Sequence, residues 1–162
     1  MGNKILIQSA DEVQDFHDPE IAKILQDMKS TMLEYKGVGI AAPQIGINKR
    51  IMMFGFESNA RYPNEKPVPF EILANPGFMP LDNEIIYSYE GCLSVPGIRC
   101  QVQRYNNIKY TGYDLINHVY IEKTVSGFHA RIVQHEIDHL NGFLILFRTD
   151  KITSASFESE LK

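Results

Sequence analysis

The sequence contains only two cysteines, Cys92 and Cys100, among its 162 residues. So small a number cannot build a disulfide framework, and it is typical of proteins that stay in a reducing compartment. Each cysteine therefore needs its own explanation.

Long apolar runs and massed basic residues are missing as well. No run approaches the ~20 apolar residues of a membrane-spanning helix, and the N-terminus has no signal-peptide core, so we expect a cytoplasmic protein without a membrane partner. Lysine and arginine are scattered and the formal net charge is −4, which gives no broad electrostatic footprint for nucleic acid. The 44% hydrophobic and 22% charged residues are ordinary globular values, and the length predicts one domain over residues 1–162.

An N-terminal helix is predicted by its start, its end and its spacing. Asp18 is typical of an N-cap, Pro19 of a first helical position and Glu20 of an acidic first turn. Lys36 and Gly37 indicate where the helix ends. Apolar residues at helical spacing predict one buried face: Ile21, Ile24, Leu25, Met28, Met32 and Leu33.

The middle of the chain has the pattern of β-structure. Runs of β-branched and aromatic residues bounded by turn residues predict strands at Arg50–Phe56, Glu71–Ala74, Ile85–Tyr89, Asn107–Tyr113 and Val119–Val125. The polar, proline-rich residues Glu57–Pro69 predict a surface loop, and Asp114–His118 predicts a hairpin turn. Beyond Phe147 the tail is polar and has no informative pattern.

From Gly127 the apolar period becomes that of a helix, which Gly142 is expected to end. Two apolar stripes run along this helix, Val133, Ile137, Leu140 and Leu144 on one and Phe128, Ile132, His135 and His139 on the other. A helix with two such stripes is buried on both sides. One N-terminal helix, a β-rich middle and a buried C-terminal helix together predict the α+β class.

The segment 135–139 of this helix has the pattern of a transition-metal site. His135 and His139 are four residues apart, so both imidazoles face the same side and can bind one ion. Glu136 lies about 100° further round the helix, where it is better aimed at a water on the ion than at the ion itself. This is the position of a general base for hydrolysis.

The alternative for this segment is a chance match on a polar helix, expected on the order of once in a few hundred chains of this length. The rest of the helix is apolar, with Ile132, Val133 and Ile137 beside the three polar residues. Burying two histidines and an acid there without a partner would be costly, which favours the metal site.

An open catalytic site needs a third protein ligand, and several candidates exist. The extended pattern with a third histidine fails, because Ile145 stands at its last position. A downstream acid, Glu158 or Glu160, would give a thermolysin-like site, but a solvated face is the favoured interpretation of both acids, because nothing around them predicts a helix that would pack against the site. Cys92 lies between Gly91 and Pro96-Gly97, an irregular strand end where a thiolate can face a cavity. Cys100, beside Arg99 on an expected β segment, lacks such a setting and is predicted to be structural.

Three separated blocks of the sequence resemble the peptide deformylase family, in the family's order. They are Gly37-Val38-Gly39-Ile40-Ala41-Ala42-Pro43-Gln44, Glu90-Gly91-Cys92-Leu93-Ser94 and Gln134-His135-Glu136-Ile137-Asp138-His139. The blocks span about two thirds of the chain, which leaves little room for coincidence.

The resemblance implies a single catalytic domain in which antiparallel sheets surround the metal-binding helix. It also implies removal of the formyl group from the formyl-methionine terminus of newly made polypeptides, with release of formate. Cys92, His135 and His139 would bind the ion and Glu136 would move the proton. The family model places the Gln44 side-chain amide and the Leu93 backbone N–H around the developing oxyanion.

The same resemblance implies where the substrate lies. Val38, Gly39 and Arg99 would contact the peptide main chain, while Phe128 and Ile132 would line the methionine pocket.

A thiolate with two imidazoles favours Fe(II), Zn(II), Co(II) or Ni(II) over Mg(II), and the family implies Fe(II) in the cell. Nascent formylated peptides are the expected partners, with transient ribosome contact.

Two rival functions remain at this point. One is an endopeptidase that uses Glu158 or Glu160 as its third ligand. The other is a structural metal domain, or a protein that only binds peptides or ribosomes. Structural zinc sites are usually closed by four protein ligands without a poised acid, so the presence of Glu136 argues against the second rival.

Overall fold

The computed structural model describes residues 2–149 and 151–161, so residues 1, 150 and 162 of the expected domain lie outside it. Its two α-helices are α1 (Glu20–Glu34) and α2 (Gly127–Leu140). Its strands are β1 (Gly39–Ala41), β2 (Ile51–Phe56), β3 (Val68–Pro80), β4 (Ile85–Cys92), β5 (Val95–Tyr105), β6 (Asn107–Asp114), β7 (Val119–Ser126) and β8 (Ala155–Phe157). The predicted α+β class is confirmed.

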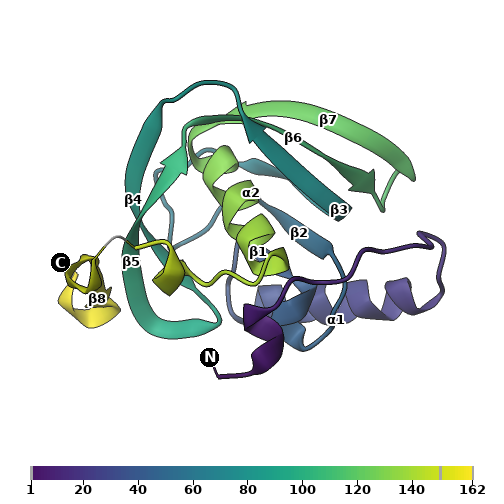
Figure 1. Ribbon diagram of the computed structural model, residues 1–162, viewed down its shortest axis with the longest axis horizontal. Helices are drawn as coiled ribbons and strands as arrows, with labels where there is room; N and C mark the ends of the chain where they lie inside the picture. The colour runs from purple at the N-terminus through teal and green to yellow at the C-terminus, as the bar shows by residue number, and fades with distance from the viewer. Residues whose placement is uncertain (1, 150, 162) are drawn as a thin grey trace.

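The strands form two antiparallel sheets on either side of α2. The larger sheet has the order β1-β2-β3-β6-β7, and the smaller one has the order β4-β5-β8. Figure 1 shows α2 running between the long β4–β5 hairpin and the larger sheet, with α1 below that sheet. The helix with the paired histidines is thus central, as the resemblance implies.

Strand β2, inside the larger sheet, is buried on both of its faces. Successive side chains of a strand point to opposite faces. Met52 and Phe54 pack toward α2, in a core that includes Ile132 of the helix. Ile51 and Met53 pack toward α1, in a second core with Met28 and Met32. The sheet is thus packed between the two helices, and this packing fixes the position of α2 over β1.

The first helix differs from its prediction at both ends. Pro19 is the N-cap residue, and the Asp18 side chain accepts a hydrogen bond from the Glu20 N–H at 2.9 Å. The last helical residue is Glu34, before Lys36 takes a positive φ of 53°. Leu33 is 61% exposed, so its placement on the buried face was wrong, whereas the adjacent Met32 is buried.

The β-structure is more extensive than predicted. Strand β3 begins at Val68, inside the predicted loop, and β5 extends well beyond the β segment expected at Arg99 and Cys100. The tail also contributes, because residues of β8 pair with Ile98, Arg99 and Cys100 of β5. The Asp114–Val119 hairpin was predicted correctly. Backbone pairing at a sheet edge leaves no mark on side-chain periodicity, which explains the missed tail strand.

Among the described residues, no helix is long and apolar enough to cross a membrane.

Candidate metal and peptide site

Helix α2 and strand β4 bring together the three side chains predicted to bind a metal ion. His135 and His139 lie one helical turn apart, with their ring centroids 5.0 Å from each other. Cys92 is the last residue of β4, beyond a shift in register between Gly91 and Cys92 that turns the strand end toward the helix. The Cys92 Sγ lies 3.2 Å from Nε2 of His139, and the ligand atoms of all three residues lie within 4.8 Å of one another.

This cluster suits a transition-metal ion. Among residues 2–149 and 151–161, no other group of three or more His, Cys, Asp or Glu side chains has its ligand atoms so close together. One thiol and two imidazoles form the donor set of an open zinc-type or iron-type site. Glu158 and Glu160, the rival ligands, are not part of the cluster.

The surroundings of Cys92 favour its thiolate form. Burial alone would raise the pKa of the Cys92 thiol, but the charge of His139 and hydrogen bonds from both histidines hold that pKa well below its usual range. Burial would likewise lower the pKa of His135, but Cys92 and Glu90 raise it. A buried thiolate between two imidazoles is the state in which cysteine binds metals.

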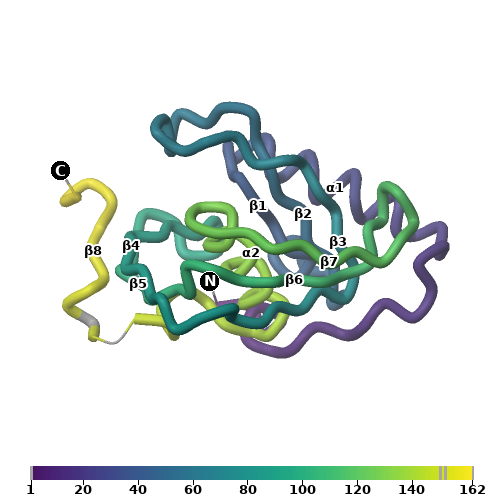
Figure 2. Tube along the Cα trace, turned by 90° about the horizontal axis from the view of Figure 1, so that it is seen from above, coloured from purple at the N-terminus to yellow at the C-terminus, as the bar shows by residue number. Residues whose placement is uncertain are grey.

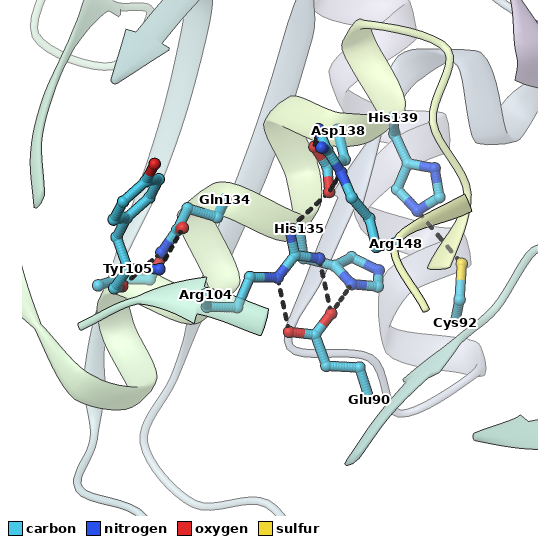
Figure 3. Close-up of polar contacts among 10 residues, drawn as sticks. Glu90, Cys92, Arg104, Tyr105, Gln134, His135, Asp138, His139 and Arg148 are labelled. Carbon is cyan, nitrogen blue, oxygen red and sulfur yellow. Dashed lines mark hydrogen bonds and ion pairs between the residues drawn. The ribbon is translucent and has the colours of Figure 1, made fainter. Parts of the chain in front are cut away.

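Behind His135 lies a buried chain of ion pairs, drawn in Figure 3. The Nδ1–H of His135 donates to Oε2 of Glu90 at 2.8 Å, which leaves Nε2 directed at the site. Arg104 donates two hydrogen bonds to Glu90, at 2.8 and 2.9 Å, and another to Asp138. Arg148 donates hydrogen bonds to both carboxylate oxygens of Asp138, including the Oδ2 that Arg104 contacts.

This chain fixes the charge of its members. Burial would raise the pKa of the Glu90 carboxyl, but the adjacent Arg104 charge and hydrogen bonds from Arg104 and His135 hold it well below its usual range. Glu90 is therefore an ionised acceptor that keeps the His135 ring in one orientation.

Glu136 stands at the pocket with an unsatisfied oxygen. Its side chain is buried, and its Oε2 has no hydrogen-bond partner among the described residues. Burial raises the pKa of Glu136 to about 7, against the opposing charges of His135 and His139. A carboxyl with a pKa near neutrality can both accept and return a proton.

Gly39 lies directly against Glu136. A Cβ built on Gly39 would overlap the Glu136 carboxylate, and it would stand 2.8 Å from the carboxyl carbon. Residue 39 must therefore lack a side chain for Glu136 to reach the pocket.

Gln44 presents its amide group to the same pocket. Its Oε1 accepts a hydrogen bond from the Ala41 N–H at 2.8 Å, and its Nε2 donates to the Ser94 hydroxyl at 3.2 Å. The NH₂ group has a second N–H besides the one given to Ser94, and Gln44 lines the pocket together with Leu93, which lies between β4 and β5.

The pocket has a volume of about 50 Å³ and contains most of the predicted site residues. Its lining includes the predicted Val38, Gly39, Gln44, Cys92, Leu93, Phe128, Ile132, His135 and Glu136, together with Gly37, Arg61, Tyr62, Glu90, Gly91 and Arg131. The predicted Arg99 is outside this lining, but its Nε lies 3.6 Å from the place of a Cβ on Gly91. His139 lies deeper, at Cys92.

Two groups of residues in and behind this pocket were not predicted from the sequence. Arg61 and Tyr62 come from the loop between β2 and β3, where a polar, proline-rich composition indicated only a surface loop. Arg104 and Asp138 were given no role in the sequence analysis. Charged residues are seldom fully buried without a partner, but the sequence alone did not show that these two residues pair with each other.

The chain is similar to known proteins along nearly its whole length. A family model described as polypeptide deformylase matches residues 1–155. Peptide deformylase 1 of Nitrosomonas europaea is 44% identical over 161 residues, which cover 99% of this chain and 91% of that protein. Peptide deformylase 2 of Ralstonia nicotianae is 45% identical over 157 residues, or 97% of this chain and 88% of that one.

Solved structures agree with the sequence relatives. The Met-Ala-Ser-bound class I type b peptide deformylase of Acinetobacter baumannii superposes with a TM-score of 0.85 at 39% identity. That match covers 91% of this chain and 94% of the other. The actinonin complex of the Synechococcus elongatus peptide deformylase gives a TM-score of 0.80 at 31% identity, covering 94% and 78% of the two chains.

Proposed function

Because this chain belongs to the peptide deformylase family, we propose that its catalytic centre is the pocket built on Cys92, His135, His139 and Glu136. The enzyme is a metal-dependent hydrolase that removes the N-formyl group from newly synthesised polypeptides and releases formate. The observation that carries the proposed centre is the approach of one thiol and two imidazoles to within 4.8 Å of one another. We propose further that residues 1–162 form one catalytic domain.

Cys92, His135 and His139 would hold one divalent ion. Such an ion, when bound, supplies a Lewis acid that lowers the pKa of water and polarises a carbonyl. The chain's own part is to keep the three donors in place. Glu90 does so for His135 through the 2.8 Å hydrogen bond to Nδ1, and Arg104 in turn holds Glu90.

Glu136 would act as general base and then as general acid. Its carboxylate takes a proton from the water that attacks the formyl carbon, and returns it to the amine nitrogen that leaves. Gln44 Nε2 and the Leu93 backbone N–H would stabilise the charge that develops on the formyl oxygen. Losing one such donor typically costs about 10²–10³ in rate.

The remaining pocket residues would bind the substrate. Val38, Gly39 and Arg99 would contact the peptide main chain, and Phe128 and Ile132 would surround the methionine side chain. The positions of Val38, Gly39, Phe128 and Ile132 in the lining of one pocket support this assignment.

We propose Fe(II) as the ion in the cell, with zinc, nickel or cobalt as substitutes in purified protein. The cell compartment would be the cytoplasm, where nascent chains begin with formyl-methionine, and ribosome contact would be transient. An iron-bound thiolate is prone to oxidation. Activity of the iron form should therefore decay in air while the nickel or cobalt form survives, and equal oxygen tolerance of all forms would contradict the iron assignment.

The two cysteines offer a matched test of the ligand set. Both are free, buried thiols, but only Cys92 reaches the histidines. We expect purified Cys92→Ala to lose its bound metal and its formate release, while Cys100→Ala keeps about one ion per chain. A stoichiometric ion in Cys92→Ala would refute the proposed centre.

A further inference from the structure

The mouth of the catalytic pocket carries two arginines from different elements. Arg61 belongs to the loop between β2 and β3, which stands out from the larger sheet in Figure 2, and Arg131 belongs to α2. Between them lies an aromatic pair, because the rings of Tyr62 and Phe128 are 4.7 Å apart. The Arg131 guanidinium lies over the Phe128 ring at 4.5 Å. The loop and the helix therefore enclose one basic, aromatic rim.

These two arginines are poorly neutralised. In the described part of the chain, Arg61 has no carboxylate nearer than Glu158 at 3.9 Å, and Arg131 none nearer than Glu65 at 3.9 Å. The arginine side chains are 31% and 14% exposed, respectively. By contrast, Arg104 makes close hydrogen bonds to buried carboxylates on both sides. The rim arginines thus retain donors for another acid.

A third cation strengthens the positive field at this rim. Arg61 Nη2 and Arg99 Nε stand 3.0 and 3.6 Å from the same point, the place of a Cβ on Gly91. The Arg99 Nε is buried and has no hydrogen-bond partner among the described residues. Like charges this close repel, and a carboxylate between them would relieve the repulsion.

We propose that Arg61 and Arg131 make this enzyme selective for formyl-methionyl chains with an acidic side chain among the first residues after methionine. The inference rests on the proposed catalytic centre and adds a preference beyond methionine itself. A planar guanidinium matches a carboxylate with two parallel hydrogen bonds. Glu158 in the tail of the chain lies 3.9 Å from Arg61, which shows that a carboxylate can approach the Arg61 guanidinium from that side.

A carboxylate can also come from the C-terminus of a short peptide. A nascent chain has no free C-terminus near its start, so the side chain is the source that matters for the enzyme. Peptides with amidated C-termini separate the two sources, because only the side-chain carboxylate remains in them.

The test measures kcat/KM of the metal-loaded enzyme on amidated formyl-methionyl pentapeptides. Glu, Gln or Lys is placed at residue two, three or four, with alanine elsewhere. Charge-assisted contacts at a partly exposed site predict a Glu-to-Lys ratio of about tenfold at one position at least. The ratio is measured within each variant, so a change in overall rate cancels.

The variants assign the preference to the rim. Arg61→Gln and Arg131→Gln should each lower the Glu-to-Lys ratio about threefold, and the double variant should bring it close to one. Lys66→Gln, which removes the same charge from an exposed site of the same loop, should keep the wild-type ratio.

The contrary outcomes are distinct. Glu and Lys peptides processed within twofold at every position would overturn the proposal, as would a double variant with the wild-type ratio. A preference seen only with free-acid peptides would assign the site to the C-terminal carboxylate and equally overturn it. If the Gln peptides are not deformylated at all by wild type, it is the proposed catalytic centre that fails.

Discussion

The carboxylate of Glu136 occupies the space that a side chain on residue 39 would need. Strand β1 therefore passes Glu136 so closely that only glycine fits, and this contact sets the distance between β1 and α2 at the pocket. The contact joins Gly39, in the first of the three blocks that resemble the family, to Glu136 on α2.

Gly39→Ala should displace Glu136 while leaving the fold intact. Because a misplaced general base loses the benefit of proton transfer, we expect formate release to fall by about 10²–10⁴. Metal content should be unchanged. Gly77→Ala is the matched control, since the nearest atom to its new Cβ is Thr111 Oγ1 at 3.9 Å, and near-normal activity of Gly39→Ala would show that the contact is not restrictive.

Glu90→Gln should weaken metal binding without removing a ligand. The amide keeps the shape of the side chain but loses the charge that holds His135 Nδ1–H and Arg104. Loss of such a partner typically costs about 10–100-fold in metal affinity, which a chelator competition would measure. Glu122→Gln, on the exposed strand β7, should retain wild-type affinity; equal affinities in both variants would refute the role of Glu90.

Arg104 should be more important for stability than Arg148, although both contact Asp138. Arg104 is 4% exposed between two buried carboxylates, whereas the Arg148 side chain is 40% exposed. Arg104→Met leaves buried Glu90 with His135 as its remaining charged partner and buried Asp138 with Arg148 alone, so we expect a loss of about 3–5 kcal/mol in the free energy of unfolding by urea. Arg148→Gln should cost less than half as much, and similar costs for the two would contradict this assignment.

His129 should make the protein less stable in mild acid. It packs between the rings of Phe54 and Tyr110, at centroid distances of 5.5 and 5.9 Å, and burial lowers its pKa against the opposing charge of Glu71. Near pH 6.5 the unfolded chain therefore binds a proton at His129 that the folded chain does not bind. The contribution of neutral His129 to the free energy of unfolding is complete above that pH and is lost as the pH falls below it.

His129→Phe removes this proton and should flatten the dependence of unfolding free energy on pH between 5 and 7, as measured by urea titration. His17→Gln serves as the control, because His17 lies at the surface beside His118. An unchanged slope in His129→Phe would contradict the depressed pKa.

The sequence predicts the site best where its residues lie on one element. Helix α2 could be predicted because apolar periodicity, a glycine end signal and the histidine spacing all act within a few turns. Cys92 is 47 residues from His139, so its irregular strand-end setting only made it a candidate, and it was the family resemblance that assigned it as the third ligand.

What could not be predicted depends on tertiary contacts. Arg61 reaches the pocket because the β2–β3 loop folds back over it, and loop composition carries no such information. The pairing of Ala155 with Cys100 joins backbone groups, so the tail strand left no side-chain pattern to read. The Glu90–Arg104–Asp138 chain likewise emerges only when β4, β5 and α2 come together.

The most direct test of the proposed centre compares wild type with Glu136→Gln, measuring both bound metal and formate released from a formyl-methionyl peptide. The substitution keeps the shape of the side chain and all three proposed metal-binding residues, but it removes the proton acceptor. We predict equal metal content in the two proteins and a rate at least about 10²-fold lower in the variant. Formate release by Glu136→Gln at the wild-type rate, with metal bound, would contradict the account.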